Sequence, residues 1–214
     1  MKRYDNLIFD FGGVLLDLAV SRCKENFRAL GFYEIENLLG TAHQKGVLDR
    51  FERGLITESE FYDSLRELIS ADVASAVPPV TDLQIWEAWV SMAEGLPAFR
   101  LEAISQLKRE GYHVSALSNT NSIHWNYCRH FFEEAGYPPE NLFEHIWLSY
   151  ELHLAKPDAA IFKKVLSLSG YDPARTLFID DALANCQVAE SCGIRSFNPV
   201  PRSDWRQALN GVLS

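Results

Sequence analysis

Five short runs of apolar, strand-type residues limit how this chain can fold more than any other feature. The first run is Leu7–Phe9, and the others are Tyr112–Leu117, His145–Leu148, Thr176–Ile179 and Ile194–Phe197. Three of the four intervals between these runs contain a segment of helical period. This alternation predicts an α/β fold with a parallel sheet and helices on its faces.

The interval after the first run is different, because it has no strand signal from Asp17 to Ala93. Capping boxes begin there at Thr57 and Thr81, and each leads into apolar residues at helical spacing. We therefore expect a Rossmann-like α/β core formed by residues 1–16 and 94–214. Residues 17–93 would form an inserted α-helical bundle cap.

Composition argues against a nucleic-acid or membrane partner. The 214 residues include 20 basic and 29 acidic side chains, and the net charge of −9 repels nucleic-acid phosphates and anionic membrane surfaces. The N-terminus lacks the apolar stretch of a signal peptide or membrane span, and the four cysteines are too scattered for a disulfide framework or a zinc site. We expect a cytoplasmic protein with reduced core thiols, and the oligomeric state is left open.

Polar residues follow four predicted strands, at the edge where open parallel sheets bind ligands. In chain order they are Asp10; Ser118 with Asn119; Lys156; and Asp180 with Asp181. Each alone is an ordinary turn or capping residue. Together they supply a carboxylate nucleophile, further carboxylates for Mg²⁺, a hydroxyl and an amide for phosphate oxygens, and a lysine that neutralises charge. The set predicts phosphoryl transfer through a covalent intermediate.

These motifs resemble those of the haloacid dehalogenase (HAD) superfamily of hydrolases. The matching segments are Asp10-Phe-Gly-Gly-Val, Leu117-Ser-Asn119, Lys156-Pro-Asp158 and Phe178-Ile-Asp-Asp181, in the order of that superfamily's four motifs. The helical insert is similar to the small bundle cap of its first cap class. Together with Glu52-Arg53-Gly54, the sequences of these motifs are most similar to those of the branch that contains α-glucose-1-phosphate phosphatase and the N-terminal phosphatase domain of soluble epoxide hydrolase.

The resemblance implies an Mg²⁺-dependent phosphatase that acts on a small phosphorylated metabolite, such as a sugar phosphate. Asp10 would attack phosphorus and become an aspartyl phosphate, which water then hydrolyses. Ser118 and Asn119 would bind the transferring group. Lys156 would lie between Asp10 and the phosphate, keep the carboxylate ionised and offset the charge of the transition state.

The resemblance also implies a metal site. Asp10, the backbone carbonyl of Gly12 and Asp181 would bind Mg²⁺. Asp180 would be a further ligand or a neighbouring acid, and Asn185 would orient the acids.

Gly12 departs from the superfamily's pattern, in which a second aspartate at this position acts as the general acid. Loss of a positioned acid costs about 10²–10⁴ in rate, or roughly 3–5 kcal/mol of barrier. Gly12 therefore favours substrates with an acidic leaving oxygen, such as anomeric sugar phosphates or acyl phosphates, or a cap residue that replaces the acid. His43 is the candidate for that residue and for substrate binding, since a single helix over 42–51 would place it on the face of Arg50. A solvated or structural histidine is the competing interpretation.

Two other functions are compatible with Gly12. One is a dehalogenase-type or other non-phosphoryl hydrolase, although the paired acids Asp180 and Asp181 suit a metal that halide displacement does not need. The other is a catalytically weak phosphate-binding regulatory protein.

Overall fold

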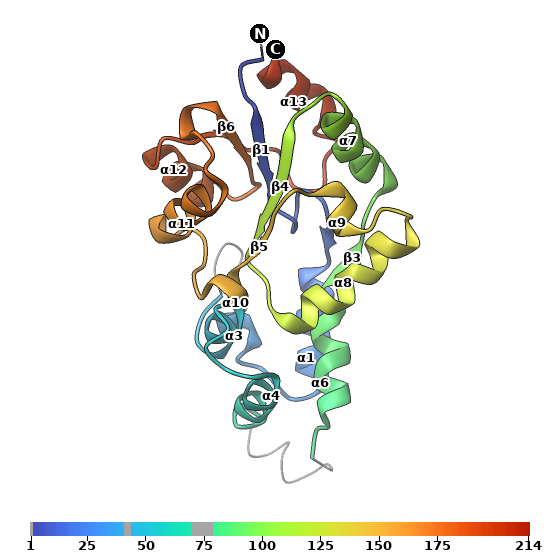
Figure 1. Ribbon diagram of the computed structural model, residues 1–214. Helices are drawn as coiled ribbons and strands as arrows, with labels where there is room; N and C mark the ends of the chain where they lie inside the picture. The colour runs from blue at the N-terminus through green and yellow to red at the C-terminus, as the bar shows by residue number, and fades with distance from the viewer. Residues whose placement is uncertain (1, 41–43, 70–78) are drawn as a thin grey trace.

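A five-stranded parallel sheet forms the centre of the molecule (Figure 1). The computed structural model describes residues 2–40, 44–69 and 79–214. The strands, in their order across the sheet, are β5 (Ile146–Leu148), β4 (His113–Ser118), β1 (Asn6–Phe9), β6 (Thr176–Ile179) and β7 (Arg195–Phe197). Every pairing is parallel, so the predicted α/β fold is confirmed. β4, β5 and β7 begin one residue later than the apolar pattern indicates.

Both faces of the sheet are buried, which explains why its strands are continuous apolar runs. Leu7 and Phe9 of β1 pack on one face, and Ile8 packs on the other. The first face is covered by α7 (Ala98–Arg109), α8 (Ser122–Glu134), α9 (Pro139–Leu142) and α13 (Arg206–Leu213). The second is covered by α11 (Ala159–Ser169) and α12 (Leu183–Ser191), on the other side of the sheet in Figure 1.

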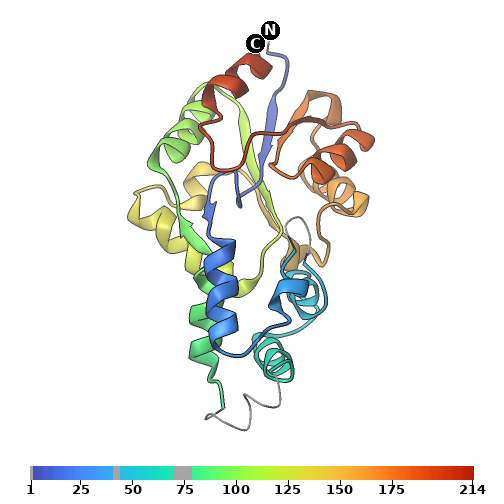
Figure 2. The ribbon, with the colours of Figure 1, turned by 180° about the vertical axis from the view of Figure 1, so that it is seen from behind.

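The segment between β1 and α7 builds a helical layer with a hydrophobic cluster of its own (Figure 2). Its described helices are α1 (Val20–Ala29), α2 (Ile35–Leu38), α3 (Val47–Glu52), α4 (Glu58–Arg66) and α6 (Asp82–Val90). Both predicted capping boxes are present, at the starts of α4 and α6. Phe27, Phe61 and Trp89 pack in the centre of this cluster.

Two expectations about this segment were wrong. Asp17–Leu18 (β2) and Ala93–Gly95 (β3) form a small antiparallel pair at its base, where no strand was expected. In addition, α3 begins at Val47 and not near residue 42, because Gly46 has a φ of 58° and breaks the helix. A helical face shared by His43 and Arg50 is therefore not available, and His43 itself lies outside the described residues.

The base of the segment is attached to the core by Arg100 of α7, whose side chain is 1% exposed. Its guanidinium donates to the Asp17 carboxylate at 2.8 Å and to the Leu15 carbonyl at 3.0 Å. A short helix, α10 (Ser149–Leu152), and a 3₁₀ turn (Pro173–Arg175) complete the described elements. All four cysteines are free and mostly buried, as expected, and no helix in the described ranges is long and apolar enough to cross a membrane.

Candidate active site

The polar residues predicted at the strand ends lie together at one edge of the sheet. β1 lies between β4 and β6, so the residues that follow these three strands become neighbours. Asp10 follows β1, Ser118 ends β4, and Asp180 and Asp181 follow β6. One oxygen from each of the three carboxylates lies within 4.8 Å of the others.

Lys156 lies in the middle of this acidic group and is 2% exposed. Its Nζ is 2.9 Å from Oδ1 of Asp10 and 2.7 Å from Oδ2 of Asp180, and it donates to the Leu117 carbonyl at 3.0 Å. Burial by itself lowers the pKa of Lys156, but the two carboxylates outweigh burial and raise it above its usual value. The ammonium group is therefore charged and is held between two carboxylates.

Asp180 is fully buried, and both of its carboxylate oxygens accept hydrogen bonds from the protein. Oδ1 accepts from the Ala182 amide at 2.8 Å, and Oδ2 accepts from Lys156. The Asn185 amide donates to both oxygens, at 3.1 and 3.0 Å, from the first turn of α12. These bonds fix the carboxylate, so Asp180 holds Lys156 in position.

Asp181 lies directly against the backbone of Gly13. Gly13 has a φ of 76°, and a Cβ there would lie 2.1 Å from Oδ2 of Asp181. Only glycine allows both this backbone conformation and this close approach. Burial and the neighbouring charge of Asp180 raise the pKa of Asp181 to about 6.

Asp10 has one engaged and one available carboxylate oxygen among the described residues. Oδ1 accepts from the Phe11 amide at 2.7 Å and from Lys156, and no protein donor is found for Oδ2. Burial raises the pKa of Asp10, Lys156 opposes this shift, and the charges of Asp180 and Asp181 add to it.

The donor set fits a divalent cation. Three clustered carboxylates and one ammonium leave two negative charges uncompensated when all are ionised. Burial makes such a surplus costly, and carboxylate and carbonyl oxygens are the ligands that hard cations prefer. Asp10 and Asp181 have free carboxylate oxygens for this purpose, whereas the oxygens of Asp180 are already hydrogen-bonded.

Ser118 and Asn119 lie beside Lys156 but are engaged differently. Nδ2 of Asn119 donates to the Lys156 carbonyl, and its Oδ1 accepts from the Lys156 amide, both at 2.8 Å. The Asn119 side chain therefore fixes the backbone of Lys156 and is not free to contact a substrate. The Ser118 hydroxyl has only a long contact of 3.4 Å to the Asn119 carbonyl and lines a cavity.

A side chain at Gly12 would first meet Leu18. A Cβ at this position would lie 3.0 Å from Cδ1 of Leu18, which comes from β2 at the base of the helical segment. A side chain at position 12 would therefore require Leu18 to move by a few tenths of an ångström. The acid is absent, and Gly12 instead lines both of the cavities described below.

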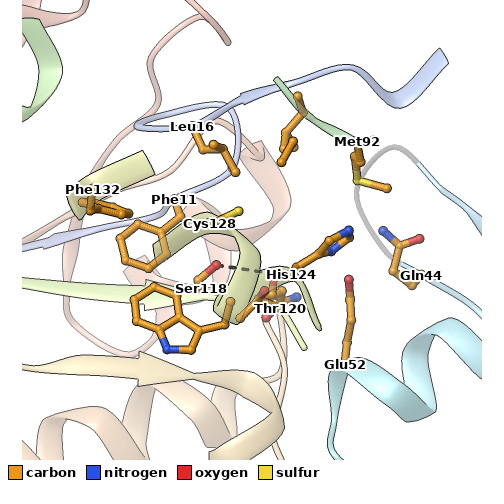
Figure 3. Close-up of a pocket in the computed structure, with 15 residues that line it drawn as sticks. Phe11, Leu16, Gln44, Glu52, Met92, Ser118, Thr120, His124, Cys128 and Phe132 are labelled. Atoms are coloured by element: carbon orange, nitrogen blue, oxygen red, sulfur yellow. Dashed lines mark hydrogen bonds between the residues drawn. The ribbon is translucent and has the colours of Figure 1, made fainter. Parts of the chain in front are cut away.

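Two adjoining cavities open at this edge of the sheet and share the lining residues Gly12, Leu18, Gln44, Glu52 and Asn119. The acidic one, also lined by Asp10, Lys156 and Asp181, contains the carboxylates. The second extends under the helical segment, where aromatic and aliphatic side chains form most of its wall (Figure 3). Its further lining residues are Phe11, Leu16, Met92, Ala93, Ser118, Thr120, His124, Trp125, Cys128 and Phe132.

Two lining residues connect the core to the helical segment. His124 of α8 stacks on Trp89 of α6 with ring centroids 4.5 Å apart, and its Nε2 donates to the Trp89 carbonyl at 2.9 Å. Burial lowers the pKa of His124 to about 4, so the ring is neutral near pH 7. Trp125 likewise lines the cavity and packs, since its ring stacks on that of Phe11.

Glu52 is a residue at this site that the sequence motifs did not single out. It ends α3, its side chain is buried, and it lines both cavities. Burial raises the pKa of Glu52 to about 8, with a further increase from the charge of Asp49. In the sequence, Glu52 stood out only as part of Glu52-Arg53-Gly54, a segment that indicated the family branch but assigned no role to the glutamate.

Comparisons with known proteins agree with this geometry. The family model for haloacid dehalogenase-like hydrolases matches residues 4–193. D-ribitol-5-phosphate phosphatase from Bacteroides thetaiotaomicron is 31% identical over 210 residues, which cover 98% of each chain.

Two solved structures superpose over nearly the whole chain. A mutant HAD family enzyme from Bacteroides thetaiotaomicron, crystallised with magnesium and inorganic phosphate, gives a TM-score of 0.88 at 40% identity, covering 96% of this chain and 98% of that one. A HAD-like family hydrolase from Porphyromonas gingivalis gives a TM-score of 0.88 at 30% identity, covering 99% and 98%. These relatives do not address the narrower branch, which stays a prediction. Since the motifs meet at one sheet edge and the family model spans most of the sequence, the chain belongs to the haloacid dehalogenase-like hydrolase family.

Proposed function

We propose that this protein is an Mg²⁺-dependent phosphatase that hydrolyses a small phosphorylated metabolite, of the sugar or polyol phosphate class. The observation that carries this proposal is the largely buried cluster of Asp10, Asp180, Asp181 and Lys156, whose surplus negative charge fits a divalent cation. The phosphatase name of one relative and the magnesium and phosphate in another support it.

In this proposal Asp10, Asp181 and the carbonyl of Gly12 hold Mg²⁺. When bound, the cation offsets the negative charge of the carboxylates and of the phosphate. Asp180 stays bonded to Lys156 and Asn185, so its role is to orient the lysine. Gly13 gives Asp181 the space to approach the backbone of the first loop.

Asp10 is the proposed nucleophile. The Phe11 amide and Lys156 orient Oδ1 for the attack on phosphorus, and the free Oδ2 would bind Mg²⁺. The P–O bond to the substrate breaks and an aspartyl phosphate forms. The Ser118 hydroxyl, the Asn119 backbone amide and Lys156 bind the phosphoryl oxygens. Water then attacks the phosphorus, inorganic phosphate leaves, and the Asp10 carboxylate is regenerated.

We propose that residues 17–93 act as a cap that selects the substrate. The cavity below the cap has a volume of about 120 Å³. At about 10–15 Å³ for a water-sized group, this is room for roughly eight to twelve non-hydrogen atoms, which matches a five-carbon polyol. The ribitol part of D-ribitol 5-phosphate, the compound in the name of one relative, is of this size. We further propose that the enzyme works in the cytoplasm, where its four free cysteines stay reduced.

A screen of phosphorylated metabolites tests this function. Purified protein is incubated with Mg²⁺ and with pentitol 5-phosphates, sugar 1-phosphates and sugar 6-phosphates, and phosphate release is measured. We expect chelator-sensitive release that is lost in Asp10→Asn. Halide release from 2-haloacids in the presence of chelator would favour a dehalogenase, and phosphate binding without turnover of any ester would favour a regulatory protein.

A further inference from the structure

The missing acid at Gly12 is a chemical problem for the proposed function. The leaving group of a polyol 5-phosphate is a primary alkoxide, which is a strong base and departs slowly unless it is protonated. Gly12 has no side chain, and none of the residues from Phe11 to Leu16 carries an acidic group that could supply the proton. The proton donor must therefore come from another wall of the cavity.

Glu52 is the only carboxyl group among the described residues that line the cavity below the cap. Figure 3 shows its side chain pointing from α3 into that cavity, beside Gln44. The other polar lining groups do not fit. The His124 ring is neutral and bonded through Nε2 to Trp89, and the hydroxyls of Ser118 and Thr120 are not acids of useful strength.

Glu52 is only 9% exposed, and its carboxyl group accepts no hydrogen bond from the residues that the structure describes. Buried polar groups nearly always have a partner, because an unpaired one is costly. A carboxyl that faces a cavity and lacks such a partner is available to a ligand in that cavity.

The core holds this part of the cap in place. The Ser149 hydroxyl donates to the Glu52 carbonyl at 2.6 Å, and Nδ1 of His153 donates to the Arg53 carbonyl at 3.0 Å. Arg53 also bonds Asp158 at 2.7 Å. At Gly54 the chain passes so close to the core that a Cβ would lie 2.2 Å from a backbone carbonyl of α10. Four contacts with the core thus fix the end of α3 over the acidic cavity.

We propose that Glu52 is the general acid and base that replaces the aspartate missing at position 12. The inference rests on the proposed phosphatase function. In the first step Asp10 attacks phosphorus, the ester P–O bond breaks, and the Glu52 proton moves to the leaving oxygen to give the free alcohol. In the second step the Glu52 carboxylate takes a proton from the attacking water. Phosphate then leaves Asp10 as the free carboxylate, and Glu52 is again protonated.

The electrostatics agree with this role. Burial raises the pKa of Glu52 to about 8, so the group carries its proton near pH 7 before the substrate reacts. The charged groups that face it are Asp49 and Arg53 from its own segment, and Asp10 and Lys156 from the core.

The test compares two esters with wild type and Glu52→Gln. The substrates are a pentitol 5-phosphate, whose leaving group needs a proton, and p-nitrophenyl phosphate, whose leaving group does not. We expect kcat/KM for the pentitol ester to fall about 10²–10⁴-fold, and kcat/KM for the aryl ester to fall less than about tenfold. Glu25→Gln, an exposed glutamate on α1, is the matched control and should leave both values unchanged.

The pH profile of the wild type gives a second readout that needs no variant. Above the pH at which Glu52 ionises, kcat/KM for the pentitol ester should decline relative to that for the aryl ester. If Glu52→Gln leaves the ratio of the kcat/KM values for the two esters unchanged, whether neither value falls or both fall equally, the role of Glu52 is overturned. Failure of the wild type to hydrolyse either ester overturns the proposed function as well.

Discussion

Gly13→Ala isolates the contact on which the metal site depends. The new Cβ would lie 2.1 Å from Oδ2 of Asp181, and real Cβ contacts essentially never fall under 3.0 Å. The carboxylate must therefore shift by about 1 Å, whereas metal sites tolerate only about 0.2 Å in ligand distance. A misplacement of about 1 Å near the chemistry can cost roughly 10²-fold in rate. We expect kcat/KM to fall by about that factor and the Mg²⁺ concentration for half-maximal activity to rise at least tenfold.

Gly170→Ala is the matched control, because Gly170 has a φ of 71° and nothing within 4 Å of its missing Cβ. Both variants carry the cost of a left-handed alanine, about 1–2 kcal/mol. For a chain of this size that cost lowers the melting temperature by roughly 2–8 °C. Only Gly13→Ala should also lose activity. If it keeps wild-type kcat/KM and Mg²⁺ dependence while its melting temperature matches that of Gly170→Ala, Asp181 is not a metal ligand.

Three further predictions follow from buried charges. In metal-free protein, Glu52→Gln should gain stability relative to wild type as the pH rises from 5 to 8, by up to about 4 kcal/mol in urea titrations. The reason is that Glu52 of the wild type has a pKa of about 8 in the folded state but an ordinary pKa of about 4.3 in the unfolded state, so that unfolding releases a proton in this pH range. Equal dependence of stability on pH in the two proteins would contradict the raised pKa. Arg100→Met should lower the free energy of unfolding by about 2–4 kcal/mol, since it leaves Asp17 unpaired at the base of the cap, and a loss under about 0.5 kcal/mol, as for ordinary surface changes, would refute the anchoring role. Mg²⁺ at a hundred times its Kd should stabilise the wild type by about 2.7 kcal/mol in thermal melts, and the same stabilisation in Asp181→Asn would place the metal elsewhere.

The sheet and the acidic cluster were predictable because their signals are local. A strand buried on both faces must be apolar along its whole length, and the residue after it falls at the ligand-binding edge. Asp10, Ser118, Asp180 and Asp181 each follow such a run directly. Lys156 was recognisable from its motif, although its contacts with two carboxylates depend on the folded loop.

The errors came from elements that are too short or too dependent on distant contacts to leave a pattern. β2 has only two residues, and its strand conformation depends on pairing with β3, which lies far from it in the sequence. The start of α3 depends on the positive φ of Gly46, where the surrounding residues suggested a continuous helix. Glu52 looks like any surface glutamate until Ser149 and His153 fix its segment over the site.

Trapping the covalent intermediate is the most direct test of the account. The enzyme is mixed with Mg²⁺ and a phosphate ester, quenched in acid during the first turnover and digested, and the peptides are analysed by mass spectrometry. We predict a phosphoryl group on Asp10, with more of it accumulated in Glu52→Gln because the water-activating base is gone. Rapid turnover with no phosphoryl group on the peptide that contains Asp10, or with the group on another residue, would contradict it.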